Sequence, residues 1–375
     1  MATSSIATPI SANAEDSTPH QQITLIKEGD VILVLQDGTR VRASSVVLSL
    51  ASPVFRTMYV KLVRDLHSCK MNSHFRIDAD IVNRLGPHYL EGQAPRSAEQ
   101  PKEVQLPEDD SNAMEMLLAL LHFHDADSRN PLVSPTQLAK LAVAVDKYDC
   151  IAALTLSTEA LLSRCTEPWA VPTSYAQRLP YYACLATAAF ILGNKNLFVK
   201  YTRLIVVGCT RSCLDITEFE ECKPLPDSVI SGLDAQRSEI RDYLVTSIAS
   251  RSSAKCQQPG CLHYSPSTNF VTEITRMAAV PHWPPPWAST SLMTVLNRLE
   301  GRGDIRLGHN FAICTHDTVN PRAISEETLK EIITECRMRG YGMCWSCARQ
   351  DKMQSKCEHV EELRAMAAKN LFVVY

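Results

Sequence analysis

The residues best suited to chemistry in this chain are cysteines at short spacing. Cys344 and Cys347 form a C-x2-C motif, and two thiolates at this spacing can face one tetrahedral zinc ion. A closed zinc site needs two more ligands. The upstream pair Cys256 and Cys261 can supply them, so these four cysteines form our candidate structural zinc site.

Three further residues are alternative ligands for the second half of such a site. His263 follows the upstream pair, while Cys357 and His359 lie just downstream of the C-x2-C motif. About eighty residues separate the two cysteine pairs, which is far more than in compact zinc fingers. Cysteines are also common as small buried hydrophobic residues, so structural zinc and plain burial both stay open.

The sequence contains no pattern that indicates catalysis. A redox-active C-x-x-C motif follows a strand and opens a helix, whereas here a helix expected over 325–339 precedes the motif and ends at Gly340. We therefore expect the motif to lie in a turn. A Gly-rich phosphate loop, GxSxG and HExxH are all missing from the sequence. We expect no catalytic residues; an enzyme with its site in the C-terminal third would need an open metal position.

Composition limits the class of protein. The 375 residues suggest two or three units, and 45% hydrophobic with 21% charged residues is enough for a sizeable core. A net charge of -3 gives no indication of a nucleic-acid or membrane partner. The N-terminus does not resemble a secretory signal, and 14 cysteines without one predict reduced thiols. We expect a cytoplasmic or nuclear protein.

The N-terminal third has the pattern of a mixed α and β fold. Residues 1–22 are rich in Ser, Thr and Ala and predict a disordered tail. The segment 31–43 predicts a β-hairpin, because an apolar β-branched run, a Gly-containing turn and a second extended piece follow one another. Ser44 or Ser45 then caps a short helix over 46–51.

Helices dominate the rest of the chain. After an irregular segment we expect a strand at 104–106, a helix at 111–122 with acidic residues before it, and an amphipathic pair of helices over 136–156. Pro, Gly and Asp separate the later helices. These are expected over 153–165, 181–192, 196–207, 236–248, 291–300 and 325–339.

Several of these segments resemble the signature of BTB/POZ domains, in a form common in fungi. The matching segments, in the family's order and spacing, are Gly29–Val34, Gly38–Leu48, Ala51–Phe55, Leu106–Asp110 and Ala144–Tyr148. The resemblance implies an α+β fold with a small sheet flanked by helices over residues 23–154. A helical extension at 155–255 and a loosely helical, Cys-containing region at 256–375 would follow.

Two features depart from the family pattern. Many members carry a His or a charged residue where this chain has Ser44, which puts the charged pocket of those members' dimer interface in doubt. An atypical insertion also interrupts the pattern at about 60–84. We consider two origins for it, a translated intron and a genuine insertion that loops tolerate at modest entropic cost.

The resemblance implies association with other proteins and no catalysis. Members form homo-oligomers or hetero-oligomers, and many recruit a cullin scaffold of a ubiquitin ligase. We expect a substrate adaptor of this kind; the alternative is a self-associating structural or transcription-related protein without a ligase connection. Val46, Val47 and Leu50 on the short helix are the expected association face, unless they are buried in the domain's own core. Association needs no cofactor, so structural zinc is the one candidate.

Overall fold

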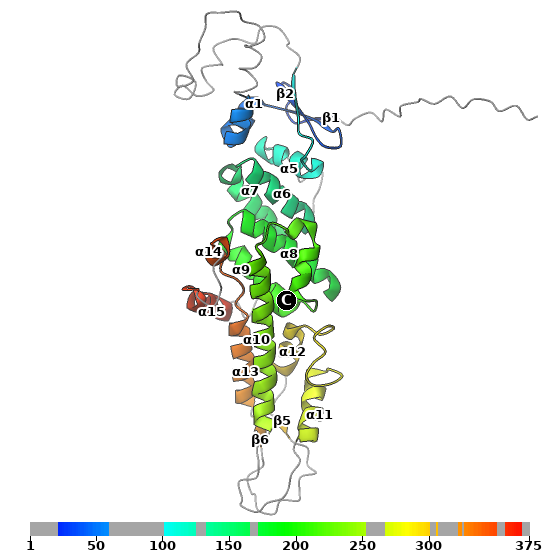
Figure 1. The fold of residues 1–375 in the computed structure, drawn as a ribbon, viewed down its shortest axis with the longest axis vertical. Coiled ribbons are helices and arrows are strands. Elements are labelled where there is room, and N and C mark those ends of the chain that lie inside the picture. Colours follow the sequence, from blue (N-terminus) through cyan, green and yellow to red (C-terminus); the bar gives the residue numbers. More distant parts are fainter. Residues whose placement is uncertain are drawn as a thin grey trace, which may run out of the picture. The chain divides into compact units, whose positions relative to one another are not determined.

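The computed structural model describes residues 22–59, 101–124, 133–165, 172–252, 267–300, 305–306, 322–324, 326–350 and 357–369 (Figure 1). The chain separates into two compact units, residues 1–125 and residues 126–375, here called unit 1 and unit 2. Residues 1–21 of the predicted tail, the insertion at about 60–84, and Cys256, Cys261 and His263 lie outside the described residues, whereas Gln22, the last residue of that predicted tail, belongs to a strand. Among the described helices, none has both the length and the apolar character that crossing a membrane requires.

A four-stranded sheet forms the centre of unit 1. Its strands are β1 (Gln22–Thr24), β2 (Val31–Val34), β3 (Arg40–Ala43) and β4 (Lys102–Gln105), in the order β1-β3-β2-β4. β2 and β3 are antiparallel, with Val31 opposite Ala43, and Gly38 takes a φ of +82° in the turn between them. The predicted hairpin is therefore confirmed. β4 pairs in parallel with β2, close to the expected strand, whereas β1, parallel to β3, was not predicted.

Three described helices accompany this sheet, and each begins where a side chain can accept backbone hydrogen bonds. α1 (Ser45–Ala51) follows the hairpin, and a second helix follows it over residues 53–59. The Ser52 hydroxyl accepts a hydrogen bond from the Phe55 N–H at 3.0 Å, which caps that second helix. Asp110 caps α5 (Ser111–Leu121) through the Ala113 N–H. The α+β fold expected for this part of the chain is thus confirmed.

Helices make up most of unit 2. The first four are α6 (Pro135–Lys147), α7 (Ile151–Arg164), α8 (Tyr175–Ile191) and α9 (Lys195–Gly208). α6 begins with a capping box between Ser134 and Gln137, and α8 packs against both α6 and α9. α8 starts six residues earlier than predicted. The error comes from Pro180, which we took as a helix break although it lies inside α8.

A second group of elements completes the described part of unit 2. They are η2 (Cys213–Glu218), η3 (Glu220–Cys222), α10 (Asp227–Ser252), α11 (Ser267–Ala278), α12 (Leu292–Glu300), β5 (Ile305–Arg306), β6 (Arg322–Ile324), α13 (Glu326–Arg339), α14 (Trp345–Arg349) and α15 (Val360–Lys369). α10 runs beside α13 and contacts it (Figure 1). α10 begins earlier than predicted and includes Gly232, which we had expected to interrupt the helix. A Cβ atom at Gly232 would lie only 2.8 Å from Cε of Met343, so the glycine allows Met343 to pack closely against α10.

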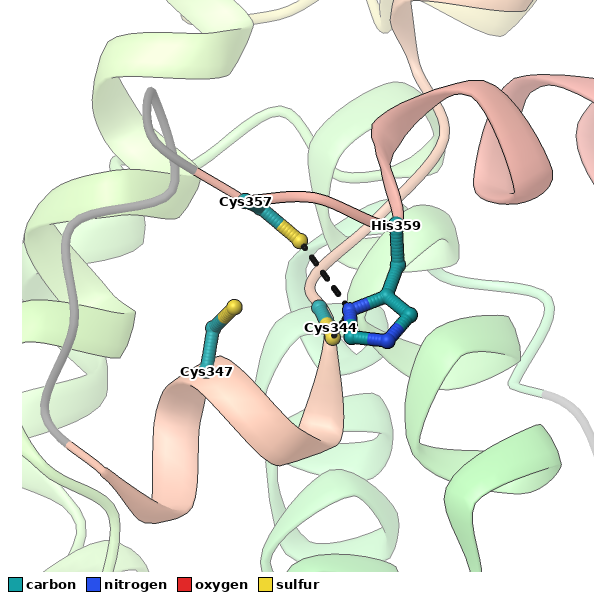
Figure 2. Close-up of side chains that lie close together, drawn as sticks. All are labelled: Cys344, Cys347, Cys357 and His359. Carbon is teal, nitrogen blue, oxygen red and sulfur yellow. Dashed lines mark hydrogen bonds between the residues drawn. The ribbon is translucent and has the colours of Figure 1, made fainter.

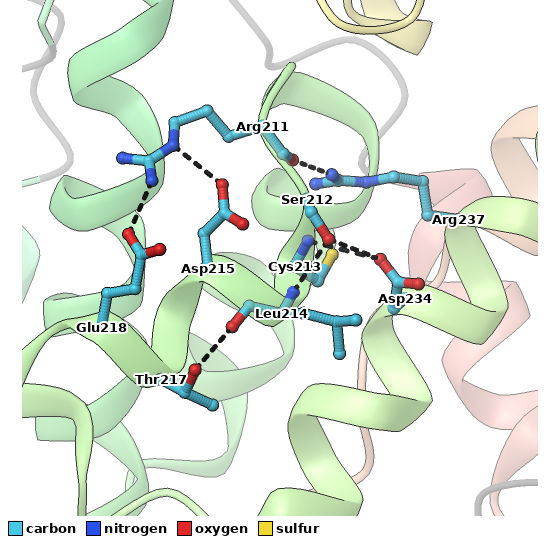
Figure 3. A network of polar contacts seen from close by, with 9 residues as sticks. All are labelled: Arg211, Ser212, Cys213, Leu214, Asp215, Thr217, Glu218, Asp234 and Arg237. Carbon is cyan, nitrogen blue, oxygen red and sulfur yellow. Dashed lines mark hydrogen bonds and ion pairs between the residues drawn. The ribbon is translucent and has the colours of Figure 1, made fainter.

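A buried arginine on α10 joins this helix to the end of α9. Arg237 donates hydrogen bonds to the carbonyl oxygens of Ile205 and Val206, which lie in the last turn of α9, and to that of Arg211. Carbonyls in the last turn of a helix have no partner within the helix, and a cation also suits the negative end of its dipole. Figure 3 shows Arg237 beside Arg211, whose own side chain pairs with Asp215 and Glu218.

The segment between α13 and α14 depends on a glycine. Gly342 has a φ of +84°, and a Cβ atom there would lie 2.5 Å from the carbonyl oxygen of Val199 on α9. Its backbone also exchanges two hydrogen bonds with the amide side chain of Gln236 on α10. A side chain at this position would therefore strain the backbone and push it away from α9.

We expect the substitution Gly342→Ala to lower the free energy of unfolding by more than about 1 kcal/mol. Gly208→Ala is the matched control, because Gly208 lies at the end of α9 with no atom within 4 Å of an added Cβ. It should be neutral or stabilise by up to about 1 kcal/mol. Urea unfolding of the two full-length variants gives both values. Equal effects of the two substitutions would contradict this account.

Candidate functional site

An apolar stripe lies exposed along the first helices of unit 1. Val46, Leu50 and Val54 follow one another at intervals of four residues, and their exposed fractions are 38%, 59% and 37%. Val46 and Leu50 belong to α1, and Val54 belongs to the helix that follows. Ser52 is extended and separates the two helices, so each helix contributes its own exposed apolar side chains. Exposed apolar side chains on helix surfaces are a feature of association faces.

The start of α1 is fixed by Asp30, at the end of the loop before β2. Its carboxylate accepts hydrogen bonds from the Ser45 N–H at 2.8 Å and from the Ser45 hydroxyl at 2.5 Å. Ser44 occupies the N-cap position, but its side chain makes no capping hydrogen bond. We predicted a serine cap; the carboxylate of Asp30 has that role instead, and its charge also suits the helix N-terminus.

Two close contacts hold Asp30 in this place. A Cβ atom on Gly29 would lie 2.5 Å from the carbonyl oxygen of Ala43, so only glycine fits here. The guanidinium group of Arg42 donates a hydrogen bond to the Gly29 carbonyl at 2.8 Å. The loop before β2 is thereby fastened to the end of β3, directly before α1.

His122 supports α1 from the end of α5. Its Nε2 accepts a hydrogen bond from the Ser44 N–H at 3.0 Å, and its Nδ1 lies 2.8 Å from the Leu118 carbonyl oxygen. The neutral ring protonated on Nδ1 satisfies both contacts. Burial lowers the pKa of His122. The His122 side chain is half-buried and bonded to the backbone directly before α1.

A second cluster of chemically capable side chains lies in unit 2. Cys344, Cys347, Cys357 and His359 bring their ligand atoms within 4.8 Å of one another, and the three cysteines are buried while the histidine is exposed. Figure 2 shows the four side chains pointing toward one another. The Nδ1 atom of His359 lies 3.7 Å from Sγ of Cys344 and 3.9 Å from Sγ of Cys357. Such a group can hold a metal ion.

Each pair of residues in this cluster lies at the start of a helix. Cys344 is the N-cap of α14 and Cys347 lies within it, so the expected turn conformation of the C-x2-C motif is wrong. We placed the motif in a turn because Gly340 ends α13, but three residues after Gly340 are enough for a new helix to begin. Cys357 and His359 directly precede α15.

Burial opposes ionisation of two thiols of this cluster, those of Cys347 and Cys357. Burial raises the pKa of Cys347 to about 12, and contacts with the other two cysteines act in the same direction. The pKa of Cys357 is also raised, again chiefly by burial. Neighbouring thiols cannot all become thiolates in a buried place unless a positive charge compensates them. A metal ion at the centre supplies that charge.

A comparison with protein-family models identifies the N-terminal part of the chain. The model described as the BTB/POZ domain matches residues 23–85. The chain contains a BTB/POZ domain. The match includes the β2–β3 hairpin, α1 and the helix over 53–59, and it continues beyond Tyr59 into residues that the structure does not describe. No curated protein and no solved structure matches this chain.

The structure places most of the residues that we expected to have a role. Val46 and Leu50 are exposed on α1 of the BTB/POZ domain, whereas Val47 is half-buried. Val54, which we did not assign to the association face, is also exposed, on the helix over 53–59. In the metal cluster, the downstream pair Cys357 and His359 joins the C-x2-C motif, and the upstream pair lies outside the described residues.

We expect the stability of the α1 region to depend on pH through His122. Because its pKa in the folded protein is lower than the ordinary value of about 6.5, the unfolded state takes up the proton first. The stabilisation is complete above that value and is lost as the pH falls below it. Hydrogen exchange of the α1 amides, followed from about pH 7.5 to 5.5, should show protection falling toward low pH.

The variant His122→Gln tests the assignment, because glutamine can accept from Ser44 without titrating. Its α1 protection should change less with pH than that of the unaltered protein. His282→Gln, at an exposed histidine of unit 2, is the control and should keep the original pH dependence. An unchanged pH dependence in His122→Gln would assign the effect to another group.

Proposed function

We propose that this chain is a protein-interaction module that associates with a second copy of itself through the face of Val46, Leu50 and Val54. The observation that carries the proposal is the exposure of this apolar stripe on the first helices of a BTB/POZ domain. BTB/POZ domains mediate protein association and oligomerisation. A two-fold interface is self-complementary, so one apolar stripe can pack against its own copy.

The size of these side chains supports a role in binding. Leu50 exposes more than half of its surface, and full burial of a side chain of this kind contributes about 1.5–3 kcal/mol. Hydrogen bonds to Asp30 and His122 hold the start of α1, so the part of the stripe on this helix is presented on a fixed backbone. A fixed surface loses less conformational entropy when a partner binds.

We further propose that the associated domain is a substrate adaptor of a cullin-type ubiquitin ligase. In this proposal the BTB/POZ domain contacts the cullin scaffold and the helices of unit 2 contact a client. The family resemblance supports this role. The alternative is a self-associating structural or transcription-related protein without a ligase, which would share the α1 interface but bind no cullin.

A binding role needs neither a catalytic group nor a cofactor. We propose that the protein is not an enzyme, that it acts in the cytoplasm or nucleus, and that a metal held by the Cys/His cluster has a structural role. All four members of that cluster are protein side chains, and an ion bound by four such ligands keeps no open position for substrate.

We expect Leu50→Asp to weaken self-association, because it would place a charge in an apolar interface. The dissociation constant should rise more than about tenfold, equivalent to about 1.4 kcal/mol. Analytical ultracentrifugation of the full chain measures this value. Leu156→Asp is the matched control, since Leu156 on α7 is 82% exposed but lies outside the stripe. A monomeric unaltered protein, or an equal effect of both variants, would contradict the α1 interface.

The adaptor role is tested separately by tagged pull-down with mass spectrometry. The full chain and a chain lacking residues 1–125, the bounds of unit 1, are compared. A cullin recovered only with the full chain is the expected result. Recovery of untagged copies of the protein without a cullin would instead favour the self-associating alternative.

A further inference from the structure

We propose that Cys344, Cys347, Cys357 and His359 bind one Zn²⁺ ion in a closed tetrahedral site, and that this ion fixes α15 to the rest of unit 2. Three thiolates and one imidazole are a donor set that zinc takes in structural sites. Magnesium and calcium prefer oxygen ligands, which this cluster does not provide.

The distances fit a zinc ion with little rearrangement. Zn–S bonds of about 2.3 Å and Zn–N bonds of about 2.0 Å place tetrahedral ligand atoms about 3.5–3.8 Å apart. The two sulfur to Nδ1 distances are 3.7 and 3.9 Å, and no pair of ligand atoms is further apart than 4.8 Å. Side-chain shifts of about 1 Å would complete the tetrahedron.

The first half of the site is held by the core of unit 2. The N–H of Met343, directly before Cys344, donates a hydrogen bond to the Thr202 hydroxyl at 2.9 Å. Trp345, between the two cysteines, donates from Nε1 to the Phe190 carbonyl at 2.9 Å, and the Lys195 ammonium lies 5.5 Å from its ring centroid. Cys344 and Cys347 are therefore placed by α8 and α9 before any metal arrives.

The second half of the site lies at the start of α15. Its buried residues in this cluster are Cys357 and Leu363, and Val360 and Tyr341 pack at the edge. α15 also contacts α13. α15 has only ten residues, and three of the four buried members of the cluster at its start are cysteines, so metal bonds would add to the packing that it makes through Leu363 and Ala367. Zinc bonds to Cys357 and His359 would join the start of α15 to the firmly held α14.

The C-x2-C motif has two competing partners, and the geometry favours the downstream one. The pair Cys357 and His359 has its ligand atoms beside those of Cys344 and Cys347. With both pairs assembled the coordination is complete, so Cys256, Cys261 and His263 are not needed as ligands. The ion therefore has no open position for a reacting water, and its role is to hold structure.

Metal content of the full chain, purified under reducing conditions, tests the site. Elemental analysis should find about one zinc per chain. The double variant Cys357→Ser/His359→Ala should lose it, whereas Cys256→Ser/Cys261→Ser should keep it. Cys336→Ser is the matched control, because this buried cysteine on α13 lies outside the cluster. Cobalt substitution gives a readout without mutation: visible d–d bands of a tetrahedral ion and strong thiolate charge-transfer absorption.

The structural consequence is read by hydrogen exchange. Removing the metal with a chelator should raise exchange in α15 strongly while leaving α8 and α9 nearly unchanged, and added zinc should restore protection. A chain that retains no zinc and gives no tetrahedral cobalt spectrum would overturn the proposal, as would a disulfide among these cysteines. Loss of zinc from Cys256→Ser/Cys261→Ser, with retention in Cys357→Ser/His359→Ala, would assign the site to the upstream pair. Equal hydrogen exchange of α15 with and without metal would contradict the proposal that the zinc ion fixes α15.

Discussion

Both candidate sites depend on places where two backbone segments lie closer together than any side chain allows. At Gly29 the neighbour is the carbonyl of Ala43, and at Gly342 it is the carbonyl of Val199. Gly29 is followed by Asp30, whose carboxylate binds the start of α1, and Gly342 lies two residues before Cys344, the N-cap of α14. Glycine permits the close contact because it has no Cβ atom, and the contact fixes the backbone beside the residue that acts at each helix start.

Hydrogen bonds from distant segments then fix the orientation of each helix. Asp30 accepts from the first backbone N–H of α1, which lacks a partner within the helix, and His122 accepts from the N–H of the N-cap residue Ser44. At α14, the Thr202 hydroxyl accepts a hydrogen bond from the Met343 N–H, and the Phe190 carbonyl accepts one from the Trp345 side chain. In both cases the partner is an element far away in the sequence. A buried polar group without a partner is costly, so these bonds select one arrangement.

This dependence on distant partners decides what could be predicted from the sequence. The β2–β3 hairpin, α5 and α6 were predicted because turn residues, caps and apolar spacing lie within each segment. β1 has only three residues and exists through its pairing with β3, so local sequence does not indicate it. Pro180 and Gly232 misled the prediction of helix starts because packing against neighbouring elements outweighs their intrinsic preference.

In the candidate sites too, local sequence indicates some residues, whereas others are recognised only through contacts with distant segments. The family resemblance and an apolar short helix led us to select Val46, Val47 and Leu50, and motif spacing led us to select Cys344 and Cys347. The role of His122 depends on a contact with Ser44 across 78 residues, which no local pattern encodes.

The second pair of metal ligands could not be chosen from the sequence either. Upstream and downstream pairs were equally acceptable by residue type, and only the packing of the chain brings Cys357 and His359 to the C-x2-C motif. Packing of this kind also explains why the cluster suits a structural ion: its ligands arise from two helix starts that need to be joined. The BTB/POZ domain, by contrast, presents its apolar residues outward, where a second chain can cover them. In our two proposals, the Cys/His cluster therefore holds unit 2 together, whereas the exposed residues of α1 bind a second chain.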